Sequence, residues 1–119
     1  MFVHVNRQQC PERPYLTDRW EDVNVWAPIL GPSASVLLWN LSRYTTALTP
    51  EWRTAAMRSI IGDAPERRLV QTLDRLAMFG ALTFTSTNVL HVQGALAEPR
   101  SGLLDLVHPE VGARIGGRL

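Results

Sequence analysis

The clearest helical periodicity in the chain spans residues 63–80. Apolar residues recur there every three or four positions, which predicts a helix with one buried face. Asp63 suits the N-cap, Pro65 suits the first turn, and Gly80 marks the end. The apolar face would comprise Leu69, Val70, Leu73, Leu76 and Ala77, and the polar face Arg67, Arg68, Gln71 and Arg75, with Thr72 at its margin.

Two shorter amphipathic segments precede this helix. Residues 33–45 predict a helix that follows Pro32, with Ala34, Leu37, Leu38, Leu41 and Tyr44 on its buried face. Its other face carries Val36, Trp39 and Arg43, which either the N-terminal arm or a second subunit would cover. Residues 49–60 predict another helix, because Thr49-Pro50-Glu51 combines a cap, a proline and an acid. Its apolar stripe would be Trp52, Ala55, Ala56 and Ile60.

Apolar and polar residues alternate along the chain after the helix predicted for residues 63–80. Residues 81–85 and 89–93 predict two short strands, joined by the tight turn Ser86-Thr87-Asn88. Pro99 interrupts the chain, and residues 101–107 predict a short C-terminal helix, with a further turn over 109–115.

The first 32 residues predict an irregular arm. Four prolines, the last of them Pro28 and Pro32, argue against a long helix in this stretch. Residues 2–5 could pair as an edge strand, and Trp20 and Trp26 would dock the arm onto the domain. We therefore expect an arm over 1–32, a domain over 33–115 and a frayed tail over 116–119.

Three helices followed by a hairpin are the element order of a winged helix-turn-helix. The stretch Trp26-Ala-Pro-Ile-Leu-Gly-Pro resembles the W-x-P-x-L-G-P lead of small winged-helix proteins from actinobacteria and their phages. The stretch Leu69-Val-Gln-Thr-Leu-Asp-Arg-Leu-Ala-Met-Phe-Gly is similar to their third helix. The resemblance covers residues 26–110. It implies an α+β, mostly helical fold with three core helices and a two-stranded wing, and DNA binding as a small transcriptional regulator or phage-type control protein.

In such a protein the third helix enters the major groove of duplex DNA. Arg67, Arg68 and Gln71 would then reach base edges, and Arg75 would hold a phosphate. Thr72 lies at the margin of this surface, and Arg53 and Asn88 are candidates for backbone contacts. The alternative is an ordinary solvated helix face, since the wing itself carries no arginine.

Charge gives DNA binding no general support. Twelve basic residues, all of them arginine, offset eleven acids, so the net charge is only +1. Any nucleic-acid role must therefore rest on a local patch.

The rival hypothesis is a protein–protein interaction module of the same fold. The chain has four tryptophans, a residue type enriched at binding hot spots. Its partner or homodimer surface would be Val36, Trp39 and Arg43.

Other function classes lack their motifs. No apolar run approaches the roughly 18 residues of a membrane span, and a single cysteine, Cys10, fits a reducing, cytoplasmic setting. The chain has no glycine-rich phosphate loop and no G-x-S-x-G elbow, so we expect no enzyme. The spacing of His4, Cys10, His91 and His108 does not match a zinc site, so neither a metal nor a cofactor is expected.

Overall fold

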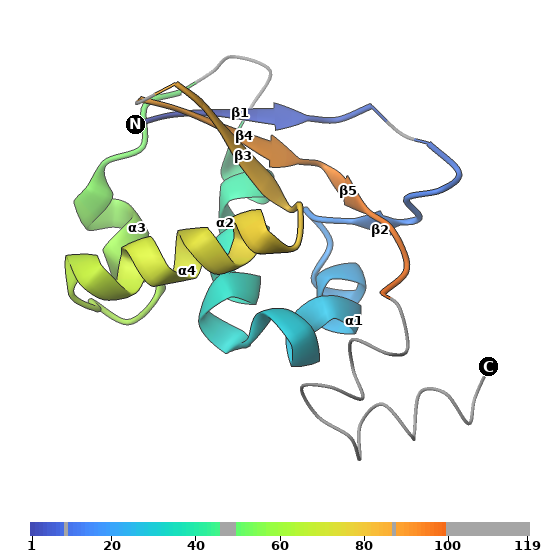
Figure 1. The fold of residues 1–119 in the computed structure, drawn as a ribbon, viewed down its shortest axis with the longest axis horizontal. Coiled ribbons are helices and arrows are strands. Elements are labelled where there is room, and N and C mark those ends of the chain that lie inside the picture. The colour runs from blue at the N-terminus through green and yellow to red at the C-terminus, as the bar shows by residue number, and fades with distance from the viewer. Residues whose placement is uncertain (9, 46–49, 87, 100–119) are drawn as a thin grey trace.

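The computed structural model describes residues 1–8, 10–45, 50–86 and 88–99. Within them the chain forms an α+β fold with four helices and two small sheets (Figure 1). The helices are α1 (Trp20–Leu30), α2 (Pro32–Tyr44), α3 (Thr54–Ile60) and α4 (Glu66–Met78). The strands are β1 (Phe2–Asn6), β2 (Tyr15–Leu16), β3 (Leu82–Ser86), β4 (Val89–Gln93) and β5 (Ala95–Leu96).

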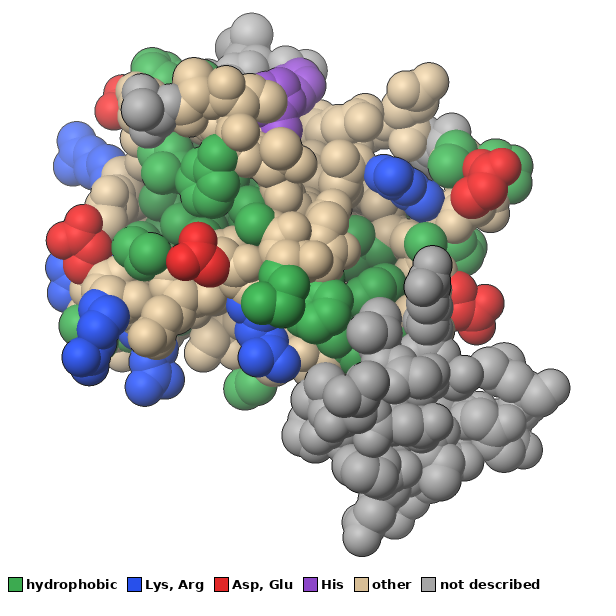
Figure 2. Space-filling view, viewed as in Figure 1, with side chains coloured by type: hydrophobic (Ala, Val, Ile, Leu, Met, Phe, Trp, Pro, Cys, Tyr) green, Lys and Arg blue, Asp and Glu red, His purple; other side chains and the backbone are tan. Residues whose placement is uncertain are grey.

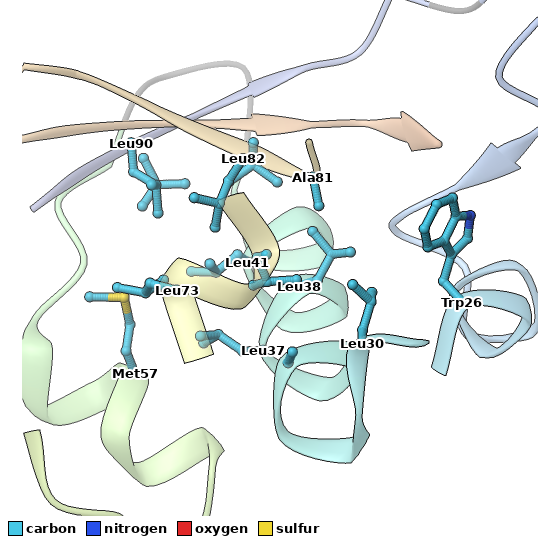
Figure 3. Close-up of a cluster of buried hydrophobic side chains, with 14 of the residues drawn as sticks. Trp26, Leu30, Leu37, Leu38, Leu41, Met57, Leu73, Ala81, Leu82 and Leu90 are labelled. Carbon is cyan, nitrogen blue, oxygen red and sulfur yellow. The ribbon is translucent and has the colours of Figure 1, made fainter. Parts of the chain in front are cut away.

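The hydrophobic core lies between the helices and the three-stranded sheet. The buried leucines of α2 point toward Leu73 of α4 and toward Leu82 and Leu90 of the sheet (Figure 3). Leu37, Leu38 and Leu41 are each 0% exposed, as the pattern of residues 33–45 predicts. That helix is confirmed to within one residue at each end.

The sheet joins the hairpin to the start of the chain. Its strand order is β1-β4-β3: β3 is antiparallel to β4, as predicted for a hairpin, and β1 runs parallel to β4. The strand expected at residues 2–5 is thus confirmed. On the side of β1 that faces away from β4, the start of the strand is covered, because the Val3 N–H donates to the carbonyl of Pro50 and Phe2 forms a bridge with Glu51.

The irregular arm predicted for residues 1–32 is wrong, because this segment contains β1, β2 and α1. Pro28 lies inside α1, near its C-terminal end, where a proline removes one backbone hydrogen bond. The helix also buries four side chains, and that burial outweighs the missing bond. The buried residues of α1 are Val23, Trp26, Ile29 and Leu30.

The second predicted helix starts later than expected. It begins at Thr54, because Glu51 is held in the bridge to Phe2 and the Trp52 N–H donates to the carbonyl of Met1. The predicted apolar stripe is also wrong in part: Ala55 and Ala56 are exposed, and Met57 is the buried residue of α3. Thr49 lies outside the described residues.

Two residues assigned to buried faces are exposed. Tyr44 ends α2 and is 58% exposed, and Val70 is 49% exposed on α4. The predicted C-terminal helix over 101–115 lies outside the described residues. None of the helices in the described part of the chain is both long and apolar enough to cross a membrane.

Candidate nucleic-acid interface

The turn before α4 fixes how this helix is presented. Gly62 and Asp63 both have positive φ, and Pro65 is the extended residue that precedes the helix. The expectation that Asp63 caps the helix is therefore wrong; aspartate instead tolerates the left-handed conformation that the turn requires. Arg58 of α3 donates from Nε to the carbonyl of Ala64 at 2.7 Å and so ties the turn to α3.

Three of the predicted contact residues are free on the surface of α4. Arg67, Arg68 and Gln71 are exposed, and no hydrogen bond or ion pair within the described residues occupies their side chains. At 100° per residue, Arg67 and Gln71 lie opposite the buried stripe of Leu69, Leu73 and Leu76. The helix thus presents these two side chains outward, as the sequence pattern predicts.

Thr72 does not belong to this surface. Its side chain is 7% exposed, and its hydroxyl donates to the carbonyl of Arg68 at 2.8 Å. The prediction that Thr72 contacts DNA is wrong, because a residue at the margin of a polar face can turn toward the core. A threonine hydroxyl in a helix commonly bonds the carbonyl one turn earlier.

Arg75 has a structural partner. Its Nε and Nη2 atoms donate to the carbonyl of Ile29 at 3.2 and 2.5 Å. Ile29 lies in the last turn of α1, whose final carbonyls lack partners within the helix. Arg75 therefore joins α4 to α1, and holding a phosphate instead would cost both of these bonds.

An open groove runs beside α4. It has a volume of about 590 Å³ and separates α4 from the segment that links α1 to α2. Arg68 and Gln71 line one side, and Gly31, Pro32 and Ser33 line the other. Arg68 and Gln71 therefore border this groove, whereas Arg67 is not among its lining residues.

The two backbone-contact candidates are exposed and lie outside α4. Arg53 immediately precedes α3, and Asn88 is in the hairpin turn, where its carbonyl accepts the N–H of Phe2 at 2.8 Å. The hairpin turn and the first turns of α4 point toward the same side of the molecule (Figure 1). In this view α3 lies between the hairpin turn and the first turns of α4.

Charge is mixed across this face. Arginine side chains gather at the end where α3 meets α4, with acidic side chains among them (Figure 2). Figure 2 also shows apolar side chains between α4 and the hairpin. Sequence reasoning missed this apolar component. Three exposed hydrophobic side chains belong to α4 and β3, namely Val70, Met78 and Phe84. The only signal for Val70 was its position at the edge of the apolar stripe.

The alternative surface on α2 is partly covered from within the chain. The rings of Trp39 and Trp20 lie 5.3 Å apart, and the Trp39 Nε1 donates to the carbonyl of Asp18 at 3.2 Å. The Arg43 guanidinium stacks 3.8 Å from the Trp39 ring. The N-terminal segment, one of the two covers that the sequence allowed, thus contacts this face. Val36 and Trp39 are half-buried, whereas Arg43 is exposed.

Metal-ligating residues do not converge. His4 and His91 are register partners on β1 and β4, with their rings 5.1 Å apart. Among the described residues, however, no three His, Cys, Asp or Glu side chains form a group that could hold an ion. His108 lies outside the described residues.

Comparison with known proteins adds no family. No protein-family model matches this chain, and neither the curated proteins nor the solved structures give a match.

Proposed function

We propose that this protein binds duplex DNA as a small winged-helix protein, with α4 in the major groove. The proposal rests on the order of α2, α3, α4, β3 and β4, which is the order of a winged helix. In that arrangement α4 takes the place of the recognition helix and the β3–β4 hairpin that of the wing. The exposed side chains of Arg67, Arg68 and Gln71 are the observation that carries it.

The position of the arginines in α4 adds an electrostatic argument. Arg67 and Arg68 lie in the first turn, where the helix dipole disfavours positive charge. Glu66 is the one acidic residue in that turn. A phosphate placed there would interact favourably with the helix end and with both guanidinium groups. Two arginines in this turn lower the stability of the free protein, and DNA binding would explain why they are there.

The free side chains also suit distinct contacts. Arg67 and Gln71 project from the centre of the exposed face, and their planar groups match guanine and adenine edges respectively. Arg68 faces the groove beside α4 and would contact a phosphate. Arg53 and Asn88 would touch the backbone on either side. Arg75 is left out of this set, since it already binds the carbonyl of Ile29.

The test is a titration of labelled duplex DNA, including fragments from around the gene for this protein, at about 50 and 200 mM salt. Arg67→Ala/Arg68→Ala should weaken binding about tenfold or more and should reduce the salt slope by about 1 for each phosphate that the variant no longer binds. Arg13→Ala/Arg19→Ala removes the same charge from the N-terminal segment and serves as the matched control. The proposal fails if no duplex binds at low salt, or if both double variants lose affinity equally.

A second candidate function is a protein-binding module of the same fold. It is favoured by the exposed apolar side chains Val70 and Met78 beside the arginines of α4. The Trp39 surface supports it less, because Trp20 covers part of that ring. Under this hypothesis Val70→Ser/Met78→Ser abolishes partner capture, whereas Trp39→Ala does so only if the α2 surface is the binding site.

A further inference from the structure

The two edges of the three-stranded sheet, β1 and β3, differ in the segments that lie against them. On the β1 side, the segment around Glu51 covers the start of the edge: the Val3 N–H donates to the carbonyl of Pro50 and the Trp52 N–H donates to the carbonyl of Met1, at 3.1 and 2.7 Å. On the β3 side, no other described segment forms a strand pair. Within the part of the chain that the structure describes, β3 is therefore a free edge.

The hydrogen-bond pattern shows which backbone groups are free. The Gln93 N–H donates to the carbonyl of Ala81 at 2.8 Å, and bonded and non-bonded positions alternate along an antiparallel ladder. Leu82 is opposite Val92 and Phe84 is opposite Leu90. Leu82 and Phe84 thus hold the non-bonded positions, and their N–H and C=O groups point away from β4.

The strand lacks two of the features that block edge pairing, namely charged residues and proline, although it is short and contains a bulge. Proteins protect free edges with charged residues or proline, and β3 has the sequence Leu-Thr-Phe-Thr-Ser. Every residue after Leu82 is exposed, and the Phe84 side chain is 44% exposed. The one irregularity is a bulge between Phe84 and Ser86. Phe84 borders this bulge, and Thr85 is the extra residue of β3, without a register partner on β4.

We propose that two copies of this chain pair through β3, antiparallel and about a twofold axis at Phe84. The residue types are symmetric about this position, because a threonine flanks Phe84 on each side. Self-pairing therefore places Thr83 opposite the partner's Thr85 and brings the two phenylalanine rings together. Threonine pairs and aromatic pairs are both favourable across strands, and an uncharged strand meets its copy without repulsion.

The outward groups fit the same axis. In an antiparallel pair the bonded position exchanges both N–H and C=O groups between facing residues. Phe84 facing its own copy would be such a position. Each Phe84 N–H would donate to the carbonyl of the other Phe84, which gives two hydrogen bonds. A single strand from each copy makes a small interface, and we expect a reversible dimer that forms between about 10 µM and about 1 mM.

The test uses the full chain and needs no DNA, so it stands apart from the proposed function. Sedimentation velocity over that concentration range should show a monomer–dimer equilibrium. Amide exchange at Phe84 should slow with concentration, whereas the amide of Leu90 on the inner strand should not change. A chain that remains monomeric throughout, or a dimer with unchanged exchange at Phe84, overturns the proposal.

A charge exchange gives a sharper version of the test. Thr83→Lys/Thr85→Lys places lysines opposite each other across the axis, and Thr83→Glu/Thr85→Glu does the same with glutamates. Each variant alone should be monomeric, and an equimolar mixture should form the heterodimer. Ala55→Lys adds charge at an exposed site on α3 and should dimerise as the unchanged protein does. Variants that still dimerise alone would place the contact elsewhere and overturn the proposal.

Discussion

The helices α2 and α4 have equal length but opposite environments. Each has 13 residues and buries leucines in the same core. The outer face of α2 is partly covered by Trp20 of α1 and by the segment around Asp18. The outer face of α4 carries no comparable cover from the described residues. The comparison teaches that amphipathicity alone does not identify a binding face, because the rest of the chain decides which polar face stays available.

The largest expected effect concerns the inner faces, where the two helices should behave alike. Leu37 and Leu76 are both 0% exposed. Leu37→Ala and Leu76→Ala should each lower the free energy of unfolding by about 2–5 kcal/mol, because each removes buried atoms and leaves a cavity. Urea unfolding measures both. A loss below about 1 kcal/mol for either variant would show that this helix does not contribute to the shared core.

The outer faces should differ. Trp39→Ala removes the contact with Trp20, the hydrogen bond to Asp18 and the stacking of Arg43, and should cost about 1–3 kcal/mol of unfolding free energy. Gln71→Ala on α4 should stay within about 0.5 kcal/mol. Thermal and urea unfolding of the two variants provide the measurement. Equal losses would remove the distinction between a covered and an open face.

A third pair of variants separates the arginines of α4. Arg75→Ala should lower the free energy of unfolding by about 1–3 kcal/mol, because it leaves the carbonyl of Ile29 without its charged donor. Arg68→Ala is the matched control and should raise the free energy of unfolding by no more than about 1 kcal/mol, because it removes a positive charge from the first turn, while weakening DNA binding. If Arg75→Ala instead weakens DNA binding at unchanged stability, the assignment of Arg75 as the link to α1 is wrong.

The smallest effect is a pH dependence in the segment that supports α1. Burial, followed by the charges of Glu98 and Asp22, raises the pKa of Tyr15 above its ordinary value of 10.0. The folded state therefore holds this proton more tightly than the unfolded state. The resulting stability is present below about pH 10 and is lost as pH rises through the folded pKa. Thermal unfolding at about pH 9 and pH 11 should show this decline, and Tyr15→Phe should reduce it.

The helices that sequence predicted well are those whose patterns are local. The boundaries of α2 and most of α4 follow from residues three and four apart, and the hairpin follows from alternation around a short turn. α1 was missed because Pro28 argued against it, although the apolar spacing of Val23, Trp26 and Leu30 was present. The start of α3 was misplaced because Glu51 pairs with Phe2, a residue near the N-terminus that is distant from α3 in sequence.

Some features of the candidate site also follow from local sequence, and others depend on tertiary contacts. The sequence by itself determined that Arg67 and Gln71 lie opposite the buried stripe of α4, because helical periodicity fixes that relation. Only the tertiary structure decided that Thr72 turns inward, that Arg75 binds Ile29 and that Trp39 is covered by Trp20. It also placed β1 beside β4 and, among the described residues, paired no other segment with the outer edge of β3. These outcomes depend on contacts between segments distant in sequence, and no local pattern records which segment supplies a side chain's partner.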